Sequence, residues 1–297
     1  MTPLLRGRAG PARRRPLDEE SARWLHELAG DGRQREEAVR RLHALLVRVS
    51  TREVHRRGHR LDLSGPELDD IAYQAAADAT IAVTAKLSQF RGESRFTTWA
   101  YAFAVFEVSA KVARHFWARP GARLADEQWA QLPARFGFQP DQEAQWRELL
   151  AALRRAVEQQ LTERQRRVFV AVVLNDEPMD TLALELSTSR NALYKTLFDA
   201  RRKLRAALVA DGHLASPTEE AVSGWSALER FLRTDPHDVG CDEAMKVMHL
   251  YVELVTADPQ HARQQFAGLA AHLEACGPCG EDFDGLLAAV RKVPDER

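Results

Sequence analysis

All three cysteines of the chain lie beyond residue 240, and a histidine stands four residues before the second of them. His272, Cys276 and Cys279 form a His-x3-Cys-x2-Cys pattern, and Cys241 lies further upstream. Positions i and i+4 share one face of a helix, and the Gly-Pro pair between the last two cysteines favours a tight turn. Three thiolates and one imidazole complete a tetrahedral set for Zn²⁺. The pattern therefore predicts one closed zinc site, structural or regulatory in type, at Cys241, His272, Cys276 and Cys279.

The number of cysteines is odd, so a framework made only of disulfides would leave one thiol unpaired. The alternative is three unrelated thiols buried in a helical domain, because free cysteine is often a core residue. Three other histidines lie outside the compact pattern and are not expected to be ligands: His237, His249 and His261. Oxidation of Cys276 and Cys279 with loss of zinc is a weaker hypothesis, since zinc-bound thiolates are often inert.

Composition is typical of soluble globular proteins. A chain of 297 residues is long enough for two or three domains, each with its own core. A hydrophobic fraction of 45% and a charged fraction of 29% are the values expected of an ordinary soluble globular protein. No apolar run approaches the about 18 residues of a membrane-spanning helix. Residues 1–17 are basic without the apolar stretch of a signal peptide, so we expect a disordered tail, a cytoplasmic location and no membrane partner.

The net charge of −1 conceals an uneven distribution along the chain. Residues 1–208 contain 35 basic and 27 acidic side chains, whereas residues 209–297 contain 7 basic and 16 acidic ones. A basic front portion suits a polyanion such as nucleic acid, and an acidic rear portion could compete with that polyanion. A chance imbalance between two domains is the alternative.

Helical periodicity predicts an all-α fold. Apolar residues recur at helical spacing in 18–29, 35–57 and 67–89, and Thr97 or Thr98 is placed to cap a helix that ends near residue 117. Segments rich in proline and glycine or lacking periodicity separate the helical parts. The predicted organisation is a basic tail at 1–17, a helical domain at 18–117, a linker at 118–140, a second helical domain at 141–209, a linker at 210–240 with a short helix at 226–232, and a zinc-binding domain at 241–292.

The second domain has the pattern of a helix-turn-helix. Thr162 and Gln165 can form a capping box at the start of one helix, residues 179–186 predict a short second helix, and residues 187–189 a tight turn. The following helix, 190–208, combines an apolar face with polar and basic residues, as a DNA recognition helix does. The alternative is a solvated basic face on a helical hairpin. The candidate DNA-binding residues are Arg190, Asn191, Tyr194, Lys195, Arg201, Arg202 and Lys203.

Two stretches of this domain, Leu161–Gln165 and Asn191–Leu204, resemble region 4 of bacterial RNA polymerase sigma factors. The resemblance implies that the long helix reads the −35 promoter element. Asp199 departs from the pattern, because a basic or neutral residue is usual at that position.

The front domain carries a second resemblance. The segment Phe90–Tyr101, preceded by Leu68–Ile71 and Gln74, is similar to region 2 of the extracytoplasmic-function (ECF) class of sigma factors. Aromatic side chains interleaved with cations suit the capture of unstacked bases in a melted −10 element. Phe106 departs from the pattern, since a polar residue is common there. The resemblance implies DNA contacts at Phe90, Arg91, Gly92, Glu93, Ser94, Phe96, Thr97, Lys111 and Arg114, and polymerase contacts at Asp69, Asp70 and Gln74.

Residues 241–290 resemble the zinc-binding anti-sigma domain, here fused in cis to the sigma-like regions. The resemblance implies a non-enzymatic sigma factor with core RNA polymerase and duplex and melted promoter DNA as partners. Two sigma-type helical domains would be joined to a small helical zinc domain. The charge asymmetry adds the hypothesis that the acidic domain docks within the chain on the sigma-like regions and regulates them.

Two other functions remain open at this stage. One is a one-component helix-turn-helix transcription factor with a zinc-dependent sensor domain, although such a protein needs no strand-opening surface. The other is a zinc enzyme, which a site closed by four protein ligands disfavours, because a catalytic zinc keeps one position for water or substrate.

Overall fold

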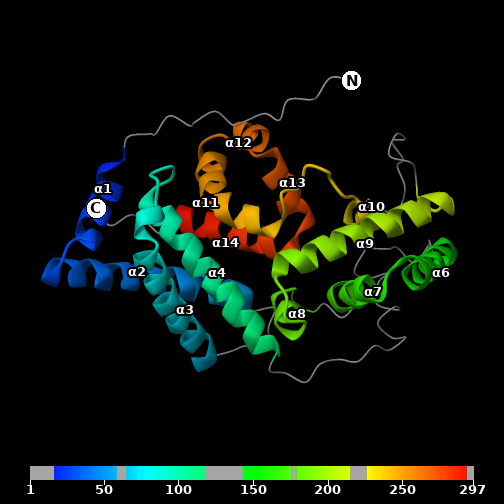
Figure 1. Cartoon of the computed structure of the whole chain (residues 1–297), viewed down its shortest axis with the longest axis horizontal. Coiled ribbons are helices and arrows are strands. Elements are labelled where there is room, and N and C mark those ends of the chain that lie inside the picture. Colours follow the sequence, from blue (N-terminus) through cyan, green and yellow to red (C-terminus); the bar gives the residue numbers. More distant parts are fainter. Residues whose placement is uncertain are drawn as a thin grey trace.

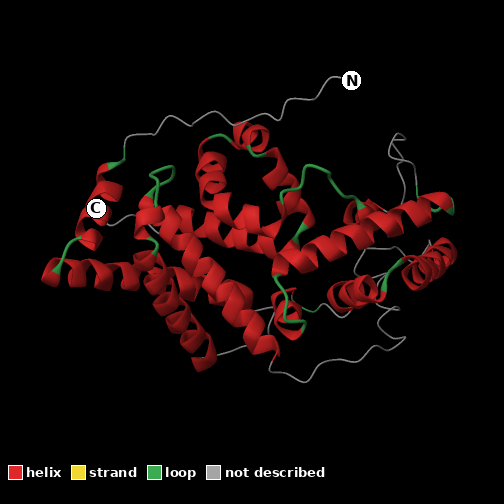
Figure 2. Cartoon of the chain, in the orientation of Figure 1, coloured by secondary structure: helices red, strands yellow, loops and turns green. Residues whose placement is uncertain are grey.

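The computed structural model describes residues 17–58, 65–117, 143–174, 177, 179–214 and 226–292, and these residues form helices joined by turns, with no strand among them (Figure 2). The prediction of an all-α fold is confirmed. The basic tail predicted at 1–17 lies outside the described part except for Leu17, and so does the whole linker at 118–140. In the described parts, no helix combines the length and the apolar character needed to cross a bilayer.

The N-terminal helices form a bundle: α1 (Glu19–Ala29), α2 (Gly32–Gly58), α3 (Pro66–Ala85), a short 3-10 turn (Leu87–Gln89) and α4 (Phe96–Trp117). Four alanines on one face of α3 are buried, and their small side chains allow α2 and α4 to pack closely against it: Ala72, Ala75, Ala76 and Ala79. The three predicted N-terminal helices agree within a few residues. The predicted caps of α4 are wrong, because Thr97 and Thr98 already lie inside the helix, which starts at Phe96.

The second group contains α6 (Glu143–Gln160), α7 (Glu163–Phe169), a π-helical turn (Val170–Leu174), α8 (Met179–Glu185) and α9 (Arg190–Ala210). The capping box at α7 is confirmed: the Gln165 amide donates to Thr162 Oγ1 at 3.3 Å, and the Thr162 amide donates to Gln165 Oε1 at 3.1 Å. Ser189 caps α9, accepting from the Ala192 amide at 3.1 Å. The helix, turn and long helix predicted for 179–208 are therefore present.

The remaining helices are α10 (Ser226–Leu232), α11 (Gly240–Ala257), α12 (Pro259–Gln265), α13 (Ala267–Ala275) and α14 (Gly277–Lys292). The sequence predicts α10, but it also predicts a linker through residues 210–240. Within the described part of that segment, α10 packs on α9 and buries Leu228 and Leu232. The last domain also has four helices, α11 to α14, where two or three were expected.

Helices α11 to α14 lie between the N-terminal bundle and the helix-turn-helix (Figure 1). Helix α14 packs against α4 and α2, while α11 packs against both α9 and α4. Buried residues from all three parts belong to one continuous hydrophobic core. The three predicted domains therefore fold as one body in which the C-terminal helices form the centre.

A buried network of charges fixes α14 in this position. Asp282 of α14 is fully buried and accepts a 2.7 Å hydrogen bond from Arg57 of α2 and 3.1 Å hydrogen bonds from Arg190 of α9. Arg57 also donates to Glu53 at 2.6 Å, and Glu53 in turn lies directly against Gly285 of α14. Each buried charge has a partner of opposite sign, as burial of charge requires.

Gly285→Ala tests this packing. A Cβ at this position would lie 2.5 Å from Glu53 Oε2, and Glu53 cannot move without leaving Arg57. We expect the free energy of unfolding to fall by about 1–3 kcal/mol, as in other overpacked cores. Chemical denaturation measures the change. Gly30→Ala is the matched control, because its Cβ would lie 3.4 Å from the nearest atom, in ordinary contact. Equal stability of the two variants would contradict this account.

Candidate metal centre and the masked face of helix α9

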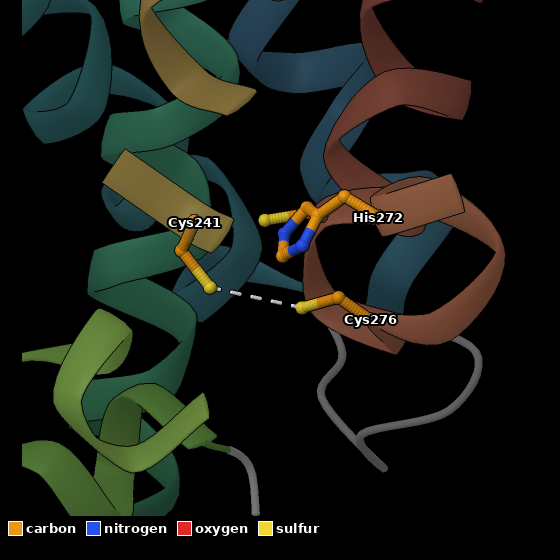
Figure 3. A group of neighbouring side chains, drawn as sticks. Cys241, His272 and Cys276 are labelled. Carbon is orange, nitrogen blue, oxygen red and sulfur yellow. Dashed lines mark hydrogen bonds between the residues drawn. The ribbon is translucent and has the colours of Figure 1, made fainter. Parts of the chain in front are cut away.

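Four side chains from three helices converge on one buried point. Cys241 lies in the first turn of α11, His272 in the last turn of α13, Cys276 between α13 and α14, and Cys279 in the first turn of α14. All four are buried, and one ligand atom from each lies within 4.8 Å of the others. Figure 3 shows Cys241, His272 and Cys276 pointing toward one another. The three cysteines are free thiols. The structure therefore brings together the four residues that the spacing predicts.

The chain turns at Cys276, one residue earlier than expected. Cys276 has extended backbone angles and its amide closes α13 by donating to the His272 carbonyl at 2.8 Å. Gly277 and Pro278 then begin α14 instead of forming the turn. The first turn of α14 thus carries Cys279 back toward the other ligands.

The hydrogen bonds of His272 fit a metal ligand. Its Nδ1 lies 2.8 Å from Asp238 Oδ1, whereas its buried Nε2 has no hydrogen-bond partner among the described residues. A metal-bound imidazole commonly donates its second N–H to a carboxylate, which orients the ring and increases its basicity as a ligand. The Tyr194 ring packs edge-on against the imidazole, with centroids 4.5 Å apart. The donor set and its surroundings therefore suit a closed Cys₃His metal site.

The side chains of the cluster shift one another's pKa values in different directions. Hydrogen bonds from Cys241 and Cys279 hold the pKa of the Cys276 thiol well below its usual value, and hydrogen bonds to Cys241 and Cys276 raise the pKa of Cys279. Burial lowers the pKa of His272, but the hydrogen bond to Asp238 and the closeness of the Cys241 and Cys276 sulfurs outweigh it and raise the pKa to about 11. A metal ion needs neutral imidazole and thiolates, so its binding releases protons and strengthens as pH rises.

The N-terminal turns of α9 contact the C-terminal helices directly. Arg190 donates to Cys279 Sγ at 3.1 Å as well as to Asp282. Asn191 Nδ2 donates to Asp242 at 2.7 Å, and the Tyr194 hydroxyl donates to Asp238. Three of the seven residues expected to bind DNA on this helix are thus held by carboxylates and one thiol of the C-terminal part.

The other four candidates on α9 differ in exposure: Arg201 and Lys203 are bonded to other parts of the protein, and Lys195 and Arg202 face solvent. Arg201 is buried and donates to the backbone carbonyls of Arg233 at 2.9 Å and of Phe231, while its guanidinium lies 4.8 Å from the centre of the Phe231 ring. Arg201, a candidate DNA-binding residue, is therefore not accessible to DNA in this conformation, because its guanidinium binds carbonyls at the end of α10. Lys203 donates to Gln165 at 2.9 Å. Lys195 and Arg202 are exposed.

The aromatic loop of the front domain is packed inward. Phe96 is fully buried and lies between Trp24, stacked at 5.6 Å, and Phe90, edge-on at 5.7 Å. Ser94 and Thr97 are also buried. In this conformation the side chains of Ser94, Phe96 and Thr97, three of the residues expected to contact DNA, are therefore not accessible to it.

The rest of this loop region is more accessible. Arg91 and Glu93 are exposed, and Gly92 has a φ of +72°, a left-handed conformation that favours glycine. The neighbouring Arg95 amide donates to Glu253 of α11 at 2.7 Å, so the C-terminal part touches this loop too. Lys111 is paired with Asp78, and the Arg114 side chain lies outside the described residues.

The candidate polymerase contacts lie on an open surface of α3. Asp69, Asp70 and Gln74 are all exposed, and Tyr73 and Ile81 add apolar area, with 58% and 67% of their surfaces accessible. Sequence reasoning did not single out these two apolar residues. It also missed Asp238, Asp242 and Asp282, for which the acidic composition of residues 209–297 was the one available signal.

Comparisons with models of protein families, with curated proteins and with solved structures find no match to this chain.

Asp238→Asn tests the role of the carboxylate behind His272. The amide keeps the shape but loses the charge that orients the imidazole, so we expect the affinity for a divalent metal ion to fall by about 10–100-fold. Titration with Zn²⁺ in competition with a chromophoric chelator measures it. Asp235→Asn is the control, because Asp235 is an exposed acid of the same loop whose carboxylate bonds only to His237 among the described residues. An unchanged affinity in Asp238→Asn would refute this role.

Proposed function

We propose that this chain is a sigma factor of the ECF class that directs core RNA polymerase to promoters and is held inactive by its own C-terminal zinc-binding domain. The observation that carries this proposal is the occupancy of the first turns of α9. Arg190, Asn191 and Tyr194, the residues placed to read DNA, are bound to Asp282, Asp242 and Asp238.

The chemistry of these contacts resembles that of a protein–DNA interface. Arginine binds phosphate or guanine through its fork of N–H donors, and asparagine binds adenine through its amide. Carboxylates on α11 and α14, and on the segment before α11, occupy the same donors. A negatively charged domain can therefore take the place of DNA on α9. Because both partners belong to one chain, the effective concentration of the mask is high and modest intrinsic affinity suffices.

The metal in this proposal is Zn²⁺, bound by Cys241, His272, Cys276 and Cys279. Three thiolates and an imidazole suit zinc and leave no position for water, so the ion supplies structure and not catalysis. Its ligands join the first turn of α11 to the junction of α13 and α14. These are also the elements that carry Asp242 and Asp282, so zinc would hold the masking carboxylates in register.

The mask would act on promoter recognition more than on polymerase binding. The candidate polymerase contacts Asp69, Asp70 and Gln74 stay exposed on α3, whereas the N-terminal turns of α9 and the loop at Arg95 are covered. A docked chain could therefore bind polymerase through α3 and still fail to read a promoter.

Co-purification with core RNA polymerase separates this proposal from the one-component transcription factor. We expect the full chain to bind the core enzyme, and Asp69→Ala combined with Asp70→Ala to weaken that binding. Run-off transcription on a promoter library then identifies the promoters. A chain that binds operator DNA by itself but never associates with core polymerase would refute the proposal in favour of the alternative.

Asp282→Asn tests the mask. Removing the charge leaves Arg57 and Arg190 without their shared buried carboxylate, and loss of one partner of a buried pair costs about 3–5 kcal/mol. We expect run-off transcription to increase by at least about tenfold, because the docked state loses its advantage. Asp284→Asn is the control, since Asp284 is exposed on the same helix. Equal transcription by wild type, Asp282→Asn and Asp284→Asn would refute the masking role.

A further inference from the structure

Two side chains of α9 reach the outer surface of the candidate metal cluster. Arg190 donates to the sulfur of Cys279 at 3.1 Å, and the Tyr194 hydroxyl donates to Asp238, the carboxylate that lies 2.8 Å from Nδ1 of His272. The Tyr194 ring also packs edge-on against the His272 ring. Helix α9 is thus linked to the metal position along two separate paths, one through Asp238 and His272 and the other through Cys279.

The first path fixes the orientation of His272. A ligating histidine depends on the acceptor of its second N–H, and that acceptor depends on its own hydrogen bonds. Asp238 is positioned by the Gly240 amide, which donates to Oδ1 at 2.8 Å, and by Tyr194, which donates to Oδ2. Loss of the tyrosine hydroxyl would leave one carboxylate oxygen without that donor and free the carboxylate to rotate away from the imidazole.

The second path compensates charge. A divalent ion with three thiolates and a neutral imidazole carries a net charge of −1, and the four ligands are buried. A buried net charge needs a partner of opposite sign. Arg190 donates to a ligand sulfur, and it also bonds Asp282 in the turn that follows Cys279. A hydrogen bond from a cation to a metal-bound thiolate stabilises that thiolate.

We infer that Tyr194 and Arg190 are positioning residues of the metal site, so that helix α9 completes the metal centre. Metal affinity then depends on the docking of α9, and by thermodynamic linkage the docking of α9 depends on the metal to the same degree. The inference rests on the proposed zinc site, and it goes beyond masking because it gives two predicted DNA-binding residues a second role in holding the metal.

The test is the affinity of the full chain for Zn²⁺, measured by competition with a chromophoric chelator. Tyr194→Phe removes one oxygen and keeps the ring packed on His272, and Arg190→Gln removes the cation. We expect each variant to bind Zn²⁺ about 10-fold more weakly. This loss is at the lower end of the range found when residues that hydrogen-bond to metal ligands are substituted. Arg190→Lys, which keeps the charge without the planar fork, should recover part of the loss.

The absorption spectrum of bound Co²⁺ provides a readout that a purely structural role would not change. Co²⁺ reports the geometry and the sulfur donation of its ligands, so both substitutions should shift its bands while circular dichroism shows unchanged helix content. Tyr73→Phe and Arg164→Gln are the matched controls, because both residues are exposed and lie on other helices. The controls should bind Zn²⁺ and Co²⁺ as wild type does.

Affinities of Tyr194→Phe and Arg190→Gln within about threefold of wild type, with unchanged Co²⁺ spectra, would overturn the inference, because outer-contact substitutions cost 10-fold or more. If circular dichroism shows that Arg190→Gln loses helix content, its metal affinity no longer reports on the site, and the result for Tyr194→Phe alone decides the test. A wild-type chain that binds neither ion would instead refute the zinc site of the proposed function. Failure to associate with RNA polymerase would leave this metal measurement unaffected, so the two proposals fail separately.

Discussion

The buried carboxylate of Asp282 is the interaction on which the arrangement of the whole chain depends. It is shared by Arg57 from the N-terminal bundle and Arg190 from the helix-turn-helix, two residues that lie 133 positions apart in the sequence. A buried charge without partners would be costly, so α14 can occupy the centre of the molecule only when both outer parts supply their arginines. The pairing therefore selects one arrangement of three helical groups among the many that apolar packing alone would permit.

The contacts around α9 differ in their sensitivity to solvent. The Asn191–Asp242 bond is exposed, whereas the bonds of Arg57 and Arg190 to Asp282 are buried or nearly so. Salt screens exposed charges over about 10 Å at moderate ionic strength and buried ones much less. In the proposed function, masking based on buried pairs would therefore persist under salt conditions that weaken binding to DNA, whose affinity falls steeply with salt.

Local patterns predict the local structure well. The cluster of four candidate metal ligands, the capping box of Thr162 and Gln165, and the bounds of α9 and α10 all follow from spacing within a few residues. The partners of Asp238 and Asp282 cannot be predicted in this way. Their contacts join residues 34 to 225 positions apart, and no periodic pattern in the sequence indicates such contacts. Packing also overrides local preference, as when Phe96 enters the aromatic core and α4 begins ahead of its expected threonine caps. Basic residues such as Arg201 look alike in sequence whether they face solvent or close a neighbouring helix.

The position of α14 in the chain has a consequence for biosynthesis. The helix that fills the centre of the fold is translated after the two groups of helices that it joins. Ribosomes add about 5–20 residues per second, so the stretch from α10 to α14 emerges several seconds after α9 is complete. During that interval Arg57 and Arg190 have no Asp282, and α9 is uncovered. In the proposed function, each newly made molecule would therefore pass through a form with α9 uncovered before α14 docks, and the rate of translation sets the minimum lifetime of that form.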